Sequence, residues 1–353
     1  MFHGLITETK TDSKPFSYTI SNTKLCPHWI TGFCDAESSF SLRTAKNSSR
    51  KSGWRVSPIF IIELDSKDLI LLKRIQEFFG VGVVSVRNNG MAVYSVQSFS
   101  DITHVIIPHF NNYPLLTQKK ADFILFSNAV QLLNEKVQST SEGLQQIINI
   151  RASMNKGLSE LLKKSFPNTV PVTRPLINIE SINHPNWLVG FVDGEGCFYV
   201  KIKKNSSKLG SQVSLVFSLI QHSSPSGGRD EILFNMILKY LGCGVIEKAT
   251  TRPNEVKYVI YKFGDICNNL IPLFQKYPLQ GVKSLNFSDF CKVANLMINK
   301  VHLTKEGLPQ IFLHLYINEE NRRRGGPHAP CGGSGLEEIN LIKSQMNTGR
   351  FKK

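Results

Sequence analysis

Two glutamates, Glu37 and Glu195, each end a copy of the same short apolar pattern, which reads WITGFCDAE at 29–37 and WLVGFVDGE at 187–195. Each copy is typical of a helix with small residues four positions apart, and such residues let two helix backbones approach closely. Two helices packed in this way would carry both carboxylates to one end of their seam. Because hard divalent cations prefer oxygen ligands, the pattern predicts a metal site shared between two paired helices.

The two copies belong to a duplication that extends far beyond the motif. Asp35 and Asp193 lie 158 positions apart, and later segments return in the same order: IFIIEL (59–64) and VFSLIQ (216–221), FGVGVV (79–84) and LGCGVI (241–246), TSEGL (140–144) and TKEGL (304–308). Only two copies occur, and each is far longer than the unit of a repeat array. The chain therefore reads as a fused pseudo-dimer, with a first repeat at 25–165, a proline-rich linker at 166–184 and a second repeat at 185–353.

Both repeats show the same order of elements. After the motif helix, the hydrophobic pattern predicts two strands, a helix, two more strands and further helices. The predicted strands are 40–45, 54–64, 83–87 and 91–99 in the first repeat, and 198–203, 212–221, 245–249 and 257–263 in the second. The predicted fold class is α+β, with two pseudo-symmetric αββαββα repeats. Each repeat carries a four-stranded antiparallel saddle, and the repeats pack through the paired motif helices.

Composition sets the class of partner. The 353 residues carry a formal net charge of +15, which attracts polyanions, most commonly phosphate backbones; a merely soluble basic protein is the plainer alternative. No run approaches the roughly 18 apolar residues of a membrane helix. Seven cysteines, an odd number without a CxxC pair, favour free thiols in a reducing compartment and argue against a zinc site.

Two segments stand outside the duplicated pattern. Residues 1–24 read as a disordered leader, since they resemble neither a secretory signal nor a typical transit peptide. Comparison of the two repeats also exposes an insertion of about 28 residues at 309–336, rich in Arg and Gly. We expect a disordered surface loop that the chemistry does not need; an arginine-rich tail that binds nucleic acid is the alternative.

The motif resembles that of the LAGLIDADG homing endonucleases, in the single-chain, two-repeat form of organellar group I introns. The resemblance rests on GFCDAE (32–37) and GFVDGE (190–195), each with Trp three residues ahead, and on two Tyr-Pro-Leu segments whose leucine is followed four residues later by Lys119 or Lys283. It implies a monomeric, Mg²⁺-dependent enzyme that cuts both strands of double-stranded DNA, leaves short 3′ overhangs and serves intron mobility. Mn²⁺ or Ca²⁺ would substitute in binding, and the expected location is the mitochondrion.

The resemblance assigns roles to individual residues. Glu37 and Glu195 would be the metal ligands and catalytic carboxylates, each serving one DNA strand, and the aspartates two residues earlier would be structural. Lys119 and Lys283 would stabilise charge near the scissile phosphate, unless they are ordinary solvated lysines. Gln221 would organise water at the second site, and its counterpart Leu64 cannot do so. The two sites are therefore expected to be unequal.

The sheets are expected to read DNA, because a twisted antiparallel ribbon fits the major groove. Alternation places a set of side chains on the face opposite the core: Ser41, Arg43, Ala45, Asn47, Arg55, Ser57 and Arg87 in the first repeat, and Tyr199, Lys201, Lys203, Asn205, Ser214 and Ser218 in the second. Each residue taken singly is also compatible with an ordinary solvated strand position. Because the two sets differ, the target should be asymmetric and about two helical turns long.

Two rival functions use the same fold. One is a maturase, which binds its own intron RNA and assists splicing; the other is a DNA-binding protein that does not cut. Retention of both Glu37 and Glu195 favours cleavage, since RNA binding needs neither. Ser38 stands where the family has glycine, kept as Gly196 in the second repeat, and this departure lowers the case for cleavage relative to binding.

Overall fold

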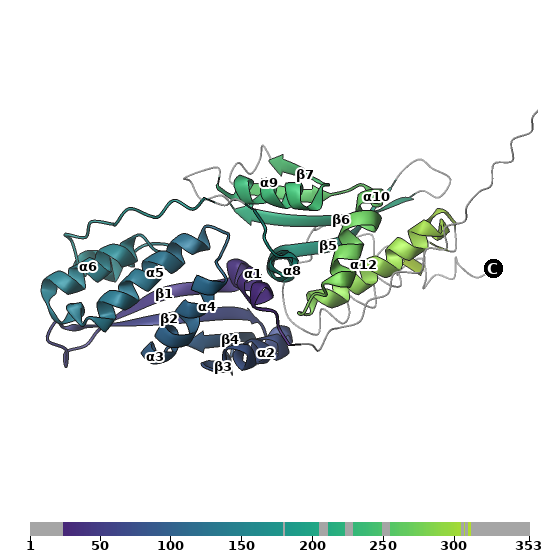
Figure 1. Cartoon of the computed structure of the whole chain (residues 1–353). Coiled ribbons are helices and arrows are strands. Elements are labelled where there is room, and N and C mark those ends of the chain that lie inside the picture. Colours follow the sequence, from purple (N-terminus) through teal and green to yellow (C-terminus); the bar gives the residue numbers. More distant parts are fainter. Residues whose placement is uncertain are drawn as a thin grey trace, which may run out of the picture.

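The computed structural model describes residues 24–178, 181–204, 211–222, 229–248, 255–304, 307 and 310–311. The expected leader, apart from Lys24, and the expected insert, apart from residues 310 and 311, lie outside these ranges. Figure 1 shows two similar halves on either side of two adjoining helices, α1 and α8. No helix among the described residues is both long and apolar enough to cross a membrane.

The first half follows the predicted order of elements. They are α1 (Pro27–Glu37), β1 (Ser38–Lys46), β2 (Trp54–Asp65), α2 (Leu69–Phe79), β3 (Val83–Val86), β4 (Met91–Val96), α3 (Phe99–Asp101), a π-helical turn (Ile102–Ile106), α4 (Ile107–Asn112), α5 (Lys119–Asn134), α6 (Ser141–Ala152) and α7 (Glu160–Ser165). The sheet has the antiparallel order β1-β2-β4-β3. The predicted strand 83–87 is one residue shorter, so Arg87 follows β3; its N–H donates to the Met91 carbonyl at 2.8 Å, in the turn to β4.

The second half repeats this order. Its elements are α8 (Pro185–Glu195), β5 (Gly196–Lys204), β6 (Ser211–His222), α9 (Arg229–Leu241), β7 (Val245–Lys248), β8 (Glu255–Ile260), α10 (Phe263–Asp265), a π-helical turn (Ile266–Leu270), α11 (Ile271–Lys276) and α12 (Lys283–Ile298). Its sheet has the order β5-β6-β8-β7. The predicted α+β class, with two pseudo-symmetric repeats and two four-stranded antiparallel sheets, is confirmed.

One face of each sheet is closed by an aromatic cluster. In the first half, Phe40 lies 5.1–5.5 Å, between ring centroids, from four phenylalanines: Phe60, Phe110, Phe123 and Phe126. In the second half, Phe198 has the matching neighbours at 5.0–5.5 Å: Phe217, Phe274, Phe287 and Phe290. These rings come from the first two strands of each sheet and from the helices above them, so the helices cover one face and leave the other to polar side chains.

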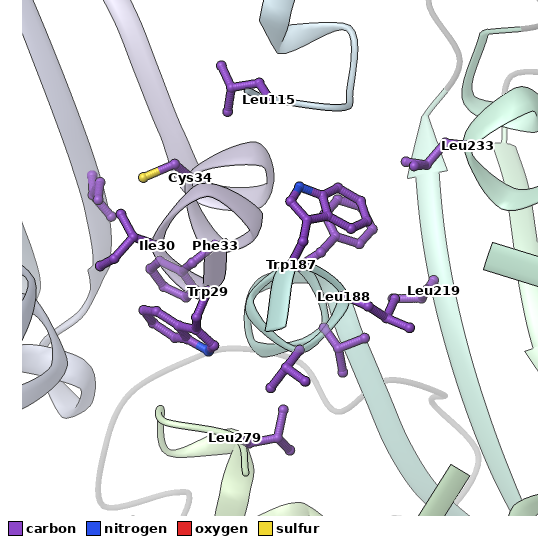
Figure 2. Close-up of a cluster of buried hydrophobic side chains, with 14 of the residues drawn as sticks. Trp29, Ile30, Phe33, Cys34, Leu115, Trp187, Leu188, Leu219, Leu233 and Leu279 are labelled. Atoms are coloured by element: carbon purple, nitrogen blue, oxygen red, sulfur yellow. The ribbon is translucent and has the colours of Figure 1, made fainter. Parts of the chain in front are cut away.

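The two halves meet through close contact of α1 and α8. A Cβ added to Gly32 would lie 1.9 Å from the carbonyl oxygen of Trp187, and one added to Gly190 would lie 2.0 Å from that of Trp29. No real side chain fits at such distances, so only glycine permits this approach. Figure 2 shows the two indole rings on opposite sides of the seam, each beside the partner helix. The close approach brings the carboxyl ends of both helices together.

The segment between the halves runs along the first one. Residues 166–178 and 181–184 form neither helix nor strand. Arg174 makes a two-pronged ion pair with Asp122 of α5, at 2.7 and 2.8 Å, and Val172 bonds to Asn149 of α6 through its N–H. The connection is therefore anchored to the first repeat before it enters α8.

Candidate active site

The carboxylates of Glu37 and Glu195 lie at the joined ends of α1 and α8, as the last residue of each helix. A Cβ added to Gly194 would lie 3.1 Å from Cγ and 3.3 Å from Oε1 of Glu37, so the Glu37 side chain reaches across the seam. The pKa of Glu195 is raised, first by burial and then by the charge of Glu37. The structure thus brings the two predicted carboxylates together at an electrostatic cost.

Lys119 and Lys283 begin α5 and α12 and reach the same helix ends. The Lys119 ammonium donates to the carbonyls of Cys34 and Ala36, at 3.0 and 3.1 Å. Lys283 donates in the same way to the carbonyls of Val192 and Gly194. Burial lowers the pKa of Lys119, while nearby acidic groups that include both glutamates oppose that shift. Neither lysine is simply solvated; each stabilises the last turn of a motif helix beside its glutamate.

Gln221 distinguishes the second site from the first. It lies near the end of β6, where its side chain hydrogen-bonds to Glu195 and lowers the pKa of that carboxyl, against the larger effect of burial. At the equivalent position of β2, Leu64 packs against the hydrophobic core. An amide can hydrogen-bond to both carboxylate and water, which a leucine cannot do, so the two sites differ chemically.

Asp35 and Asp193 hold the seam instead of facing the carboxylate site. Asp35 accepts hydrogen bonds from the indole of Trp187 at 2.8 Å and from the loop at Leu116 and Thr117. Asp193 accepts from the indole of Trp29 at 2.9 Å and from the backbone of Gln280 and Gly281. Each aspartate is thus bonded to a tryptophan of the other repeat and to the loop that leads to its own lysine. Burial raises the pKa of Asp193 to about 6.

Ser38 causes no distortion at the first site. Its backbone is extended, with φ −88° and ψ 164°, close to the −71° and 146° of Gly196. Its hydroxyl donates to the Cys34 carbonyl at 2.7 Å. A Cβ added to Gly196 would lie 2.5 Å from Cγ1 of Val192, and Val192 stands where the first repeat has Cys34. Ser38 is accommodated with an extended backbone and a hydroxyl bonded to the Cys34 backbone, so the structure shows no distortion of the first site by this residue.

The polar face of the first sheet contains most of the residues predicted for it. Cross-strand pairing sets Arg43 opposite Ser57 and Ala45 opposite Arg55, so these four side chains share one face. Ser41 lies next along β1 on that face. Arg87, after β3, pairs with Glu63 at 2.7 Å. Asn47 lies beyond β1, and its side chain accepts hydrogen bonds from Ser49 within the turn.

The second sheet departs from the prediction at one residue. Lys201 pairs with Ser214, and Tyr199 and Lys203 flank Lys201 on the same face. Ser218 is also on that face by alternation, but only 1% of it is exposed. It sits on the central strand between Cys197 and Val259, so its assignment to an open surface is wrong. Alternation gives the face of a strand but not how far along the strand that face stays open. Asn205 lies outside the described residues.

Comparison with known proteins decides the family. The sequence family described as LAGLIDADG endonuclease matches residues 30–130 and 188–294, which is more than half of the chain. This protein belongs to the LAGLIDADG endonuclease family. It is 44% identical over 307 residues to "Probable intron-encoded endonuclease 3" of Neurospora crassa, an alignment that covers 86% of this chain and 56% of that protein. It is 37% identical over 300 residues to "Probable intron-encoded endonuclease 2" of the same fungus, covering 82% and 64%. The chain thus spans about 60% of the length of these relatives.

Solved structures of LAGLIDADG proteins superpose on both halves. I-SmaMI bound to uncleaved DNA target in the presence of calcium ions gives a TM-score of 0.79 at 42% identity, covering 82% of this chain and 98% of that one. I-SmaMI bound to cleaved DNA also gives 0.79 at 42% identity, with 83% and 96% covered. I-LtrWI bound to target DNA gives 0.78 at 37% identity, with 82% and 95% covered.

The LAGLIDADG carboxylates fit a divalent cation. Burial and mutual repulsion raise the pKa of Glu195, and a bound cation would offset both effects. Among the described residues, no group of three or more His, Cys, Asp or Glu side chains is arranged to hold a metal. Glu37 and Glu195 would therefore need further ligands from DNA phosphates and water, which is how Mg²⁺ is usually held.

Sequence reasoning missed several residues of the LAGLIDADG sheet faces, because it followed alternation only along the first two strands and at Arg87. The same alternation and register place further polar side chains on these faces: Ser85, Ser95, Gln97, Gln212, Glu247 and Lys257. Tyr261, just after β8, donates its hydroxyl to the Glu247 carboxylate. These residues could have been found from the sequence, since side chains on the other two strands also alternate between the two faces of the sheet.

Proposed function

We propose that this protein is a site-specific, Mg²⁺-dependent endonuclease that cuts both strands of a long double-stranded DNA target, leaves short 3′ overhangs and serves intron mobility. The observation that carries the proposal is the pair of carboxylates, one from each repeat, joined across the glycine seam and each accompanied by a lysine. A single seam between two sheets gives one carboxylate for each DNA strand. The relatives solved with uncleaved and cleaved DNA support the same reaction.

The residues of the chain would act mainly by position. A bound Mg²⁺ would supply a water made nucleophilic and stabilise the leaving oxygen. Glu37 and Glu195 hold the negative charge that attracts the cation, and the seam fixes their separation. Lys119 and Lys283 place positive charge beside them, where charge develops on the scissile phosphate. Gln221 orients groups at the second site through its bond to Glu195. Mn²⁺ or Ca²⁺ would also bind.

The sheet faces would read the target. Arg43 and Arg55 in the first repeat can address guanine edges, as can Lys201 and Lys203 in the second, while Tyr199 and the serines supply other contacts. Because the two faces differ, we propose an asymmetric site. The chain would act as a monomer on one duplex in a mitochondrion. Light scattering of the complex would show one protein for each duplex, and immunoblotting of purified mitochondria would check the location.

Strand-resolved cleavage tests the reaction. A library of duplexes resembling intron insertion sites is incubated with the protein and Mg²⁺, and each strand is labelled separately. We expect Glu37→Gln and Glu195→Gln each to slow the cutting of one strand by about 10²–10³-fold, as happens when one transition-state electrostatic group is removed. Glu160→Gln is the matched control, since Glu160 is exposed and pairs only locally with Lys163.

Two outcomes would contradict the endonuclease. One is that no duplex is cut while the host intron RNA is bound and its splicing improves, which would show a maturase instead. The other is specific duplex binding without cleavage that is unchanged in Glu37→Gln, which would show a DNA-binding protein without catalysis.

A further inference from the structure

Helix α12, which begins with the candidate catalytic Lys283, is held at its start by a residue of the other repeat. The N–H of Val282, the residue just before the helix, donates to Oδ1 of Asp68 at 3.0 Å. Asp68 immediately precedes α2 in the first repeat. A carboxylate at a helix N-terminus satisfies an otherwise unpaired N–H and interacts favourably with the helix dipole. Asp68 therefore caps a helix that its own repeat does not contain.

In the first repeat, the next N–H along the chain, at the start of α5, is bonded from within the repeat. There, the hydroxyl of Thr117 accepts a hydrogen bond from the N–H of Lys119 at 3.1 Å and donates to Asp35 at 2.6 Å. The position equivalent to Thr117 is Gly281, which has no side chain to do this. A Cβ at Gly281 would lie 3.3 Å from Oδ1 of Asp68 and 3.2 Å from Cδ2 of Leu71, so the space of the missing side chain is filled by α2.

A second contact across the repeats holds the same loop. The Arg74 guanidinium, also on α2, donates to Oε1 of Gln280 at 2.7 Å and to its carbonyl at 3.4 Å. The N–H of Gln280 in turn donates to Asp193 at 2.7 Å. The residue equivalent to Arg74 in the second repeat is Met236, which cannot make such bonds. The loop from Pro278 to Val282 is thus clamped between α2 and the end of α8.

We propose that Asp68 and Arg74 are positioning residues of the second active site, supplied by the first repeat. They fix the loop 278–282, and the loop fixes where Lys283 enters α12 and reaches the carbonyls of Val192 and Gly194 beside Glu195. This inference rests on the proposed endonuclease activity. It makes the cutting of one strand depend on side chains of the repeat that holds the other carboxylate.

A strand-resolved assay separates positioning from general stability. The strand of the second site is the one whose cutting Glu195→Gln slows more. We expect Asp68→Ala and Arg74→Ala to lower kcat for that strand by about 10-fold or more, since a misplacement of about 1 Å can cost up to about 10²-fold. The KM for the duplex and the rate on the other strand should stay within about twofold. Thr117→Val, the matched variant of the first repeat, should slow the opposite strand.

A rescue variant addresses the mechanism. In Asp68→Ala the cap is lost and the space beside Gly281 opens. Adding Gly281→Thr to this background would supply a cap within the second repeat, as Thr117 does in the first, and should recover at least half of the lost rate. If Asp68→Ala and Arg74→Ala slow both strands equally, in step with a lowered Tm, the positioning role is wrong.

Hydrogen exchange keeps the inference testable if the wild-type protein cuts no duplex, a result that would overturn the proposed activity alone. We expect amides in 278–285 to exchange at least about 10-fold faster in Asp68→Ala, while those in 114–121 stay unchanged. Unchanged exchange in 278–285 would overturn the inference, whatever the cleavage assay shows.

Discussion

In the first repeat, Nε2 of His109 and the hydroxyl of Thr31 lie 3.2 Å apart in a buried pair, whereas Leu273 and Val189 occupy the equivalent positions of the second repeat. The same contrast appears at Gln221 and Leu64, but with the polar group in the second repeat. Neither repeat is uniformly the more polar. Equivalent positions have the same backbone setting in the two repeats, but the polarity of the side chains that occupy them differs.

The largest expected effect concerns what the repeats share. Gly32→Ala and Gly190→Ala should each reduce the free energy of unfolding by about 3 kcal/mol, because the added Cβ meets a carbonyl oxygen of the other helix. Urea denaturation measures the loss. Gly264→Ala is the control, since a Cβ there meets nothing within 4 Å. A much smaller loss of unfolding free energy at one of the two seam glycines would show that the two repeats do not contribute equally to the seam.

The next effect distinguishes the two indole contacts across the seam. Asp35 receives three hydrogen bonds from its loop besides that of Trp187. Asp193 receives two besides that of Trp29. Losing an indole donor should therefore cost more at Asp193, so we expect Trp29→Phe to lower the free energy of unfolding by about 2 kcal/mol and Trp187→Phe by less. Equal losses in the same denaturation assay would show that the extra bond of Thr117 contributes nothing.

A reciprocal exchange at the active sites should have a smaller effect. Gln221→Leu copies the first repeat and should slow the strand of the second site about tenfold, equal to about 1.4 kcal/mol of activation free energy. Leu64→Gln copies the second repeat. It should change the rate at the first site and so reduce the difference in cutting rate between the two strands. Single-turnover cleavage with each strand labelled measures both. If neither exchange changes the ratio of the two rates, the sites do not differ through this residue.

The smallest effect at neutral pH concerns the buried histidine. Burial, assisted by the charge of His28, lowers the pKa of His109 from 6.5 to about 4. As the pH falls below 6.5, the imidazole of His109 becomes protonated in the unfolded chain but stays neutral in the folded protein. The free energy of unfolding therefore decreases progressively down to about pH 4. The double variant Thr31→Val, His109→Leu, which copies the second repeat, should flatten this part of the stability profile. An unchanged slope between pH 4 and 6.5 would contradict the lowered pKa.

Much of this organisation could be predicted from the sequence for definite physical reasons. Small residues four apart identified the seam, because only they allow such close helices. The period of two located the strands, and repetition of Phe40 as Phe198 matched their registers. The pairing of Glu37 with Glu195 followed from the direction of the two helices. Each of these features depends on local pattern or on the duplication, and both are visible in one chain.

The contacts between the repeats could not be predicted in this way. The motif contains both Trp29 and Asp35, but only docking shows that each indole bonds to the aspartate of the other copy. The two lysines were expected to act on phosphate, and nothing in their spacing shows that they also stabilise the ends of α1 and α8. Ser218 was misplaced for a related reason, since burial along a strand depends on its neighbours in space.

The crossed tryptophan and aspartate contacts also bear on how such proteins can be recombined. A hybrid that joins one repeat of this chain to a repeat of a relative must bring the glycine, the tryptophan and the aspartate of its motif helix in matching positions, because each serves the partner. The polar sheet faces, which we propose to read the target, take no part in these seam contacts. If those faces read the target, new target preferences could be assembled by exchanging them, as long as the seam and the contacts of Asp68 and Arg74 with the loop 278–282 are inherited together.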